Sequence, residues 1–424
     1  MVQRSVLPAQ VRWQHSDVIC SGIDQTQLVI ADAPTGHVPF SFMVMGDTDA
    51  GEPTDFAQGF AQQLIQHMGE SRFLLHTGDV AYPVGTYRNY LEGFLRPYQA
   101  LLSGVSSDAT PTSLRRSAAK IVFNRPLLPV PGNHDYAQVS TRAYWWHRAM
   151  VCLCDRLCQT LNIDLGCNGG YNGAAYGQVF LDNLAQIPAD RLAAHLSAHY
   201  NALLSEPLPG VTEATEATGA TGATYGLSYQ AGVFTRLPNR YYHFRYSGVD
   251  FFALDSNTWN TSADEPGFDH QQLAWLEQGL ITSCQMPNTI GRIIYLHHSP
   301  YTTEESRWQQ LETLWVRRHL RKVLDRVAAN VSLPKTSPLI DLVMSGHAHC
   351  FEHVRTVDTG HADSCLDWVV CGGSGASLRR QRKGDSTEIL ETIAAEKLSA
   401  EKLSVKSPQK MLAYLCSIGI TLAW

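Results

Sequence analysis

The sequence of 424 residues predicts a layered α/β fold. Three observations lead to this prediction. Short apolar runs of strand length recur along the chain, segments with helical spacing lie between them, and polar residues follow most of the apolar runs. Strands that alternate with helices form layered sheets whose functional groups gather at the strand ends.

Each run that we expect to form a strand stops close to a glycine or a polar residue. These runs cover 40–45, 73–76, 121–130, 250–254, 291–296 and 339–344. Two prolines, Pro126 and Pro129, interrupt the third run. Apolar residues at helical spacing predict helices at 56–68, 271–280 and 308–327.

Two stretches depart from this alternation. Residues 152–229 form a long insertion that ends in a low-complexity tract of threonine, alanine, glutamate and glycine, which predicts a surface loop. Residues 386–407 contain a tandem repeat of Ala-Glu-Lys-Leu-Ser, which predicts a charged, exposed segment or a short helix. The chain is therefore divided into an N-terminal segment at 1–38, a domain at 39–384 with an insertion at about 152–229, and a C-terminal segment at 385–424.

The overall composition is that of a globular protein. Hydrophobic residues make up 44% and charged residues 17%, and the net charge of −6 argues against nucleic acid as the main partner. Uninterrupted apolar runs of membrane-spanning length are missing, so we expect no membrane partner. Residues 1–21 lack the apolar core of a signal peptide, and the ten cysteines are spread along the chain. We therefore expect a cytoplasmic protein with reduced thiols.

Five predicted strands are followed by groups of residues that can bind metal. Glycine precedes four of the groups and permits the sharp turn that brings the backbone close to an ion. Because the carboxyl ends of the strands share one edge of a sheet, we expect the groups to converge there. They are Gly46-Asp47-Thr48-Asp49, Gly78-Asp79-Val80-Ala81-Tyr82, Gly132-Asn133-His134-Asp135, His297-His298-Ser299-Pro300 and Gly346-His347-Ala348-His349.

These side chains supply oxygen and imidazole ligands, which suit Mn, Fe or Zn. A bridging carboxylate with two sets of further ligands suits two ions roughly 3.5–4 Å apart, a pair that activates water and clamps a phosphoryl oxygen. Each group alone has a common structural explanation as a turn or a core residue. Five groups in this order make that explanation improbable.

The series GD, GDxxY, GNHD, HxP and GHxH resembles the calcineurin-like metallophosphoesterases. The tyrosine of GDxxY, together with residues 241–257 and 372–376, is similar to the purple acid phosphatase branch. The resemblance covers residues 42–376, except for most of the insertion. It implies a four-layer α/β/β/α sandwich that hydrolyses a small phosphomonoester with a hydroxide held by two metal ions (Fe, Mn or Zn).

Carried over by position, the resemblance implies a role for each matching residue. Asp79 would bridge the two ions, with Asp47, Tyr82 and His349 on the first ion and Asn133, His298 and His347 on the second. His298 is preferred to His297 because it fits the HxP pattern. Neighbouring strand residues point to opposite faces, so we expect only one of the two histidines to reach the metal. His134 would stabilise charge or protonate the leaving oxygen, and Asp135 would orient its imidazole.

Several alternatives stay open at this point. Asp49 stands where the purple acid phosphatases usually have glycine. It would replace or join Tyr82 on the first ion, or it is a solvated carboxylate of the turn, which is the favoured interpretation. The spacing of Cys152, Cys154, Cys158 and Cys167 differs from the usual zinc patterns, and we expect buried thiols. The same site would also serve a phosphodiesterase or nucleotide hydrolase. A non-catalytic scaffold would show eroded ligands, whereas all seven positions here carry competent residues.

Overall fold

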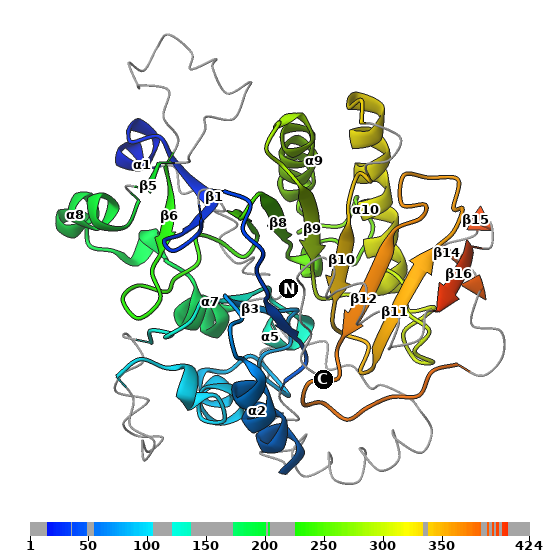
Figure 1. The fold of residues 1–424 in the computed structure, drawn as a ribbon, viewed down its shortest axis with the longest axis horizontal. Coiled ribbons are helices and arrows are strands. Elements are labelled where there is room, and N and C mark those ends of the chain that lie inside the picture. Colours follow the sequence, from blue (N-terminus) through cyan, green and yellow to red (C-terminus); the bar gives the residue numbers. More distant parts are fainter. Residues whose placement is uncertain are drawn as a thin grey trace.

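The structure is a computed structural model that describes residues 15–34, 36–48, 55–104, 121–136, 173–200, 202–203, 225–333 and 338–382, and short strands between 388 and 405. The described elements form the predicted α/β fold (Figure 1). They comprise a large mixed sheet, a small parallel sheet and helices that pack against them. Within the described ranges, no helix is long and apolar enough to cross a membrane.

The large sheet has the strand order β13-β16-β11-β12-β10-β9-β8-β7-β1-β6-β5. Its central strands are parallel, and β9 is buried along its whole length because both faces of the sheet are covered. On either side of these strands the neighbouring strand runs antiparallel. The central strands are β8 (Val249–Ala253), β9 (Gly291–Tyr295), β10 (Leu342–Ser345) and β12 (Asp367–Cys371), and their antiparallel neighbours are β7 (Tyr242–Tyr246) and β11 (Phe351–Thr356).

Strands from the N-terminal segment, the insertion and the C-terminal segment also belong to this sheet. Strand β1 (Ile23–Ile30), from the N-terminal segment, pairs in parallel with β7 and with β6 (Tyr225–Tyr229). Strand β5 (Ala202–Leu203) pairs with β6. Strand β16 (Glu401–Val405), from the C-terminal segment, pairs with β11, so the short helix expected between 386 and 407 is wrong where this segment is described. The remaining short strands are β13 (Glu388–Ile389), β14 (Thr392–Ile393) and β15 (Glu396–Lys397).

The small sheet consists of three parallel strands, β2 (Met43–Met45), β3 (Leu74–His76) and β4 (Leu127–Pro129). All three are buried and shorter than the apolar runs that predicted them. The first residues of the runs at 40–45 and 121–130 belong to the connecting chain, because the strands begin only at Met43 and Leu127. Strand β4 begins after Pro126, a residue that has no N–H to donate to a ladder.

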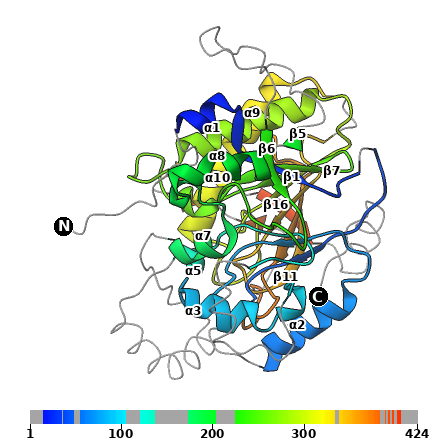
Figure 2. The ribbon, with the colours of Figure 1, turned by 90° about the vertical axis from the view of Figure 1, so that its left-hand side faces the viewer.

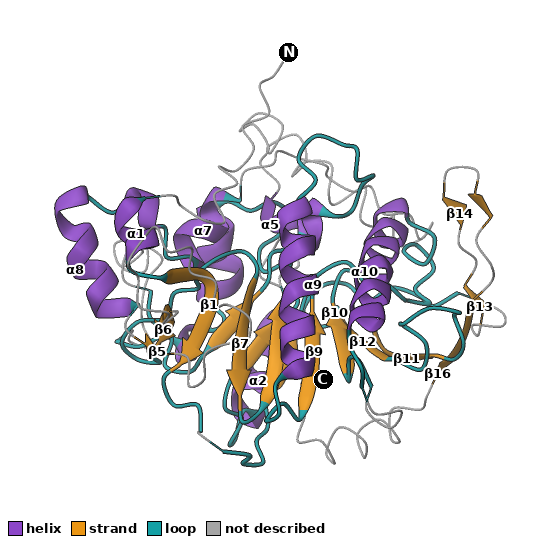
Figure 3. Cartoon of the chain, turned by 90° about the horizontal axis from the view of Figure 1, so that it is seen from above, coloured by secondary structure: helices purple, strands orange, loops and turns teal. Residues whose placement is uncertain are grey.

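Alternate residues of the central strands face two different cores. One set packs between the two sheets, and the other set packs against α9 (His270–Gln285) and α10 (Leu311–Asn330), which lie side by side over the large sheet (Figure 3). The first set includes Phe251, Ile293 and Leu342, and the second set includes their neighbours Phe252, Ile294 and Val343.

Aromatic rings join the two sheets. Phe42 stacks on Phe73 at 5.2 Å between centroids, and Phe73 meets Phe251 of β8 edge-on at 5.4 Å. Helix α2 (Asp55–His67) adds Phe60 and Leu64 to the same core, and Figure 2 shows it on the far side of the strands from α9. The smaller helices are α1 (Ser16–Cys20), α3 (Tyr87–Asn89), α5 (Asn133–Tyr136), α7 (Ala174–Phe180) and α8 (Ala189–His199).

Candidate metal centre

Three of the predicted ligands have a left-handed backbone. The φ angles are 56° at Asp47, 53° at Asp79 and 66° at His347. Each residue stands just beyond a parallel strand, β2, β3 or β10, where the chain leaves its sheet. L-residues adopt this conformation at a cost in free energy, and such strain concentrates at functional sites. The side chains of all three contact other predicted ligands.

The phenol of Tyr82 connects the residues expected around the first ion. Its oxygen Oη lies 3.0 Å from Oδ1 of Asp47, 2.8 Å from Oδ2 of Asp79 and 3.1 Å from Nε2 of His349. The same nitrogen of His349 lies 3.4 Å from Oδ1 of Asp47. The structure therefore brings these four predicted residues together.

A second group surrounds the amide of Asn133, the first residue of α5. Its oxygen Oδ1 lies 3.0 Å from Nε2 of His297 and 3.1 Å from Nδ1 of His347. The two histidine nitrogens are 3.2 Å apart, and Nε2 of His297 lies 3.3 Å from Oδ2 of Asp79. Ligand atoms of Asp79, His297 and His347 thus lie within 4.8 Å of one another, close enough to share one ion after small movements.

The histidine that joins this group is His297, whereas the HxP pattern favoured His298. Nitrogen Nδ1 of His298 lies 2.8 Å from Oγ of Ser256, and its Nε2 is buried with no hydrogen-bond partner among the described residues. Adjacent residues beyond β9 point in different directions, so only one of them reaches Asp79. The structure thus places His297 beside Asp79 and His347, and it places His298 beside His347 and Glu312.

Both oxygens of Asp79 are used. Oδ1 accepts a hydrogen bond of 2.8 Å from the backbone N–H of His134, and Oδ2 faces both Tyr82 and His297. Burial alone would raise the pKa of Asp79, but the positive charges of His297 and His134 outweigh it and hold this pKa well below its usual value. Burial would likewise lower the pKa of His297, but Asp79 raises it to about 9.

The donor set fits metal ions. The Asp47 and Asp79 carboxylates are 0% and 1% exposed, and the ion pairs that they form with described residues are with His349 and His297, which are candidate metal ligands themselves. Buried carboxylates require a compensating cation. The described residues around them supply an amide, a phenol and three imidazoles and no thiolate, a combination that suits Fe, Mn or Zn.

His134 and Asp135 have different surroundings. The half-buried ring of His134 lies 4.1 Å from the ring of Tyr82, and its Nδ1 lies 2.8 Å from the carbonyl oxygen of Pro83. Asp135 was expected to orient this imidazole, but its fully buried carboxylate has other partners. It accepts hydrogen bonds from the backbone N–H groups of Val80, Ala81 and Gly132 and from the hydroxyl of Tyr90. Asp135 therefore ties together the two loops that carry Asp79 and Asn133.

Two glycines permit the close packing of these loops. A Cβ atom at Gly132 would lie 2.1 Å from Oδ1 of Asp79, and one at Gly346 would lie 2.5 Å from Oδ2 of Asp47. Neither position has room for a side chain unless a ligand carboxylate moves. The glycines that signalled the motifs in the sequence are thus required by close approach.

Several sequence-based expectations fall outside the described residues. Asp49, the alternative ligand of the first ion, is one of them. The cysteines at 152, 154, 158 and 167 also lie there. The structure adds one residue that no motif marked: Gln310, whose Oε1 lies 3.0 Å from Nε2 of His347.

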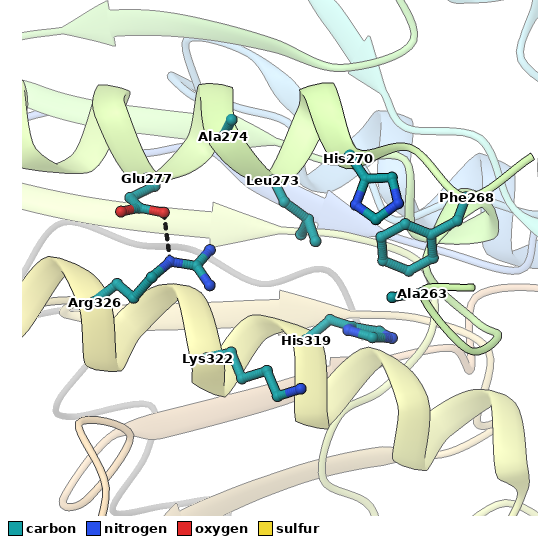
Figure 4. A pocket seen from close by; sticks show the side chains of 9 residues that line it. All are labelled: Ala263, Phe268, His270, Leu273, Ala274, Glu277, His319, Lys322 and Arg326. Atoms are coloured by element: carbon teal, nitrogen blue, oxygen red, sulfur yellow. Dashed lines mark hydrogen bonds and ion pairs between the residues drawn. The ribbon is translucent and has the colours of Figure 1, made fainter. Parts of the chain in front are cut away.

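A hollow of about 260 Å³ lies between α9 and α10 (Figure 4). The ion pair between Glu277 and Arg326, 2.6 Å long, spans it, and His270 and His319 line its other end. None of the predicted ligands lines this hollow. The candidate centre around Asp79 is therefore a separate site.

No protein-family model and no curated protein matches this sequence. Among solved structures, purple acid phosphatase PPD1 from yellow lupin (Lupinus luteus) seeds is 13% identical with a TM-score of 0.42, and the alignment covers 88% of this chain and 50% of that one. GAP50, the anchor in the inner membrane complex of Plasmodium, is 15% identical (TM-score 0.37; 90% and 96% covered). PhoD is 10% identical (TM-score 0.36; 80% and 58% covered). This chain thus spans about half the length of the lupin phosphatase, and likenesses this low establish no activity for it.

Proposed function

We propose that this protein is a metal-dependent phosphoester hydrolase that acts on a small phosphomonoester and has the four-layer α/β/β/α sandwich of the metallophosphoesterases. The observation that carries the proposal is the position of the Asp79 oxygen Oδ2. It lies 2.8 Å from Oη of Tyr82 in one group of ligands and 3.3 Å from Nε2 of His297 in the other. A carboxylate oxygen that faces both ligand groups is well placed to bridge a pair of ions.

In this proposal Asp47, Tyr82 and His349 hold one ion, and Asn133, His297 and His347 hold the other. Asp79 contributes to both. Two ions bound here would lower the pKa of a water molecule and neutralise charge on a phosphoryl group. The strained turns at Asp47, Asp79 and His347 keep these ligands close together before any ion is bound.

His134 is proposed to protonate the leaving oxygen. Because a carbonyl oxygen only accepts, Nδ1 of His134 donates its hydrogen to Pro83 and the ring is fixed in one orientation. In the protonated ring Nε2 carries the second hydrogen, which is the one available for transfer. The half-buried position beside Tyr82 keeps this edge within reach of a substrate bound at the metal centre.

The test is hydrolysis of p-nitrophenyl phosphate and bis-p-nitrophenyl phosphate by protein reconstituted with Fe, Mn or Zn. We expect turnover of the monoester by wild type and none by Asp79→Ala. Asp264→Ala, which removes an exposed carboxylate, is the matched control and should behave as wild type.

Turnover of the diester alone would replace the proposal by a phosphodiesterase or nucleotide hydrolase. Stoichiometric binding of two ions without hydrolysis of either ester would favour a non-catalytic scaffold. Equal rates for wild type and Asp79→Ala would show that the hydrolysis comes from another site or from a contaminant.

A further inference from the structure

We propose that Gln310 is a positioning residue that fixes the tautomer of His347, so that Nδ1 of His347 presents its lone pair to the metal centre. This inference rests on the proposed function in one respect, namely that His347 is a metal ligand. It assigns a role to a residue that lies in none of the five motifs.

Gln310 immediately precedes α10, and its half-buried side chain has three partners. Its oxygen Oε1 lies 2.9 Å from Nη1 of Arg307 and 3.0 Å from Nε2 of His347. Its nitrogen Nε2 lies 2.9 Å from Oε2 of Glu312. The amide thus stands between a cation, a carboxylate and the imidazole of a candidate ligand.

Arg307 and Glu312 determine which way the amide of Gln310 is oriented. The guanidinium of Arg307 has only donors, so the amide atom that it meets must be the oxygen. The carboxylate of Glu312 accepts, so the atom that it meets must be the NH₂ group. An amide flipped by 180° would place donor against donor and acceptor against acceptor, which excludes that orientation.

The orientation of Gln310 then determines the tautomer of His347. An oxygen that only accepts requires Nε2 of His347 to carry the hydrogen. A neutral imidazole has one such hydrogen, so Nδ1 holds the free lone pair. Nδ1 lies 3.2 Å from Nε2 of His297, and the protonated ring of His297 can donate its Nε2 hydrogen to the lone pair. Oδ1 of Asn133, 3.1 Å away, is an acceptor as well, so this contact supplies no hydrogen bond in the metal-free protein and suits a shared ion instead. A hydrogen bond at the remote nitrogen commonly orients a metal-binding histidine in this way.

A competing arrangement uses the same residues. Ligand atoms of His298, Glu312 and His347 also lie within 4.8 Å of one another, and Nε2 of His298 is buried and unpartnered among the described residues. An additional ion at that place would need a lone pair from His347. In our proposal Nε2 of His347 carries the hydrogen that Gln310 accepts, and the lone pair on Nδ1 faces Asn133 and His297, so the two arrangements make opposite demands on His347. We therefore assign Glu312 to the support of Gln310.

The direct test is the tautomer of His347 in metal-free, full-length protein labelled with ¹⁵N in the histidine rings. Its signals are identified by their loss in a His347→Asn variant. We expect hydrogen on Nε2 and a bare Nδ1 in wild type, and a mixture of tautomers in Gln310→Leu. Gln309→Leu removes the exposed neighbouring glutamine and should leave the wild-type pattern.

The second readout is the affinity for Zn²⁺ measured by competition with a chelator. Loss of the supporting partner of a metal-binding histidine typically costs about 10–100-fold in affinity. We expect that loss for one of two ions in Gln310→Leu and for neither in Gln309→Leu. Gln310→Glu combined with Glu312→Gln, which keeps an acceptor for His347 and a donor–acceptor pair between the two side chains, should bind both ions nearly as wild type does.

Hydrogen on Nδ1 of His347 in wild type overturns the proposal, whether or not any variant folds. Unchanged tautomer and Zn²⁺ affinity in Gln310→Leu overturn it as well. A third Zn²⁺ per chain that disappears in Glu312→Gln would establish the competing ion site instead. If wild type binds no Zn²⁺ at all, the proposed function fails, while the tautomer still decides whether Gln310 positions His347.

Discussion

Oδ2 of Asp79 lies 3.3 Å from Nε2 of His297, and both side chains are buried. Their attraction lowers the pKa of the carboxyl group and raises that of the imidazole to about 9. Asp79 is thus ionised and already matched by a positive charge. His298, the next residue, makes its hydrogen bond to Ser256 instead. This difference between two adjacent histidines leads to the first prediction.

His297→Ala should remove one of two bound ions, whereas His298→Ala should leave both. His297 contacts Asp79 and Asn133, and its loss removes a ligand outright, so the affinity for that ion should fall by more than the roughly 10–100-fold that loss of a supporting partner costs. The measurement is metal content after dialysis. Both residues are fully buried, so each variant is the other's control for packing. The reverse result would restore the assignment that the HxP pattern favoured.

Tyr82→Phe should abolish the visible absorption of the iron-loaded protein. Oη of Tyr82 lies within 3.1 Å of Asp47, Asp79 and His349, so an Fe³⁺ ion among these groups would bind it as a phenolate. A ferric phenolate has a charge-transfer band, which needs the oxygen that phenylalanine lacks. Absorption spectra of both proteins, with Fe³⁺ verified by electron paramagnetic resonance, are the measurement. A ferric wild type without the band would exclude Tyr82 as a ligand.

The sequence predicted most of the central elements because their apolar patterns are local. The helix expected at 56–68 is α2 (Asp55–His67), and the run at 250–254 is β8 (Val249–Ala253). In contrast, β1 was placed in a separate N-terminal segment. It joins the sheet between β6 and β7, and partners about 200 residues away leave no local trace in the sequence.

The candidate site was also predictable only where local motifs mark its residues. The motifs named Asp47, Asp79 and Asn133, and in the structure Tyr82 contacts the first two while His297 contacts Asp79 and Asn133. Motif spacing favoured His298, whereas His297 is the histidine that contacts Asp79, because the direction of each side chain depends on where β9 ends. It also missed Gln310, since a single glutamine before a helix has no distinctive spacing. Positions set by register and by long-range packing are therefore the ones that needed the structure.

Gly132→Ala and Gly59→Ala should have opposite effects on stability. A Cβ at Gly132 would meet Oδ1 and the backbone nitrogen of Asp79 at 2.1 and 2.3 Å, so the variant must displace the shared carboxylate. Gly59 lies inside α2 with nothing within 4 Å of an added Cβ. Alanine there should raise the free energy of unfolding by about 0.5–1 kcal/mol.

Urea unfolding and metal content measure both glycine variants. Gly132→Ala should lose stability and bound metal together, and Gly59→Ala should keep its metal. A Gly132→Ala protein with full metal content would show that the loop at 132 relaxes without moving Asp79.

Asp250→Asn should destabilise the protein strongly at neutral pH and less in acid. Oδ1 of this buried carboxylate lies 3.1 Å from Nε2 of His243 and 3.2 Å from Nε of Arg245, both on β7. Burial alone would raise the pKa of Asp250, but these partners outweigh it and lower that pKa below its usual value of 3.8. A lowered folded-state pKa stabilises the fold above pH 3.8, and the contribution disappears as pH falls through the folded-state value. Breaking such a buried pair costs about 3–5 kcal/mol.

Asp341→Asn provides a control of opposite sign, because burial raises the pKa of the Asp341 carboxyl group. A raised folded-state pKa disfavours folding when the group is ionised, so wild type should gain stability relative to Asp341→Asn as the pH falls. The stability advantage of wild type over Asp250→Asn should instead shrink as the pH falls over the same range. Urea unfolding of the three proteins at several pH values between 7 and about 3 gives both differences. If the advantage of wild type over Asp250→Asn grew as the pH fell, the pKa of Asp250 in the folded protein would not be lowered.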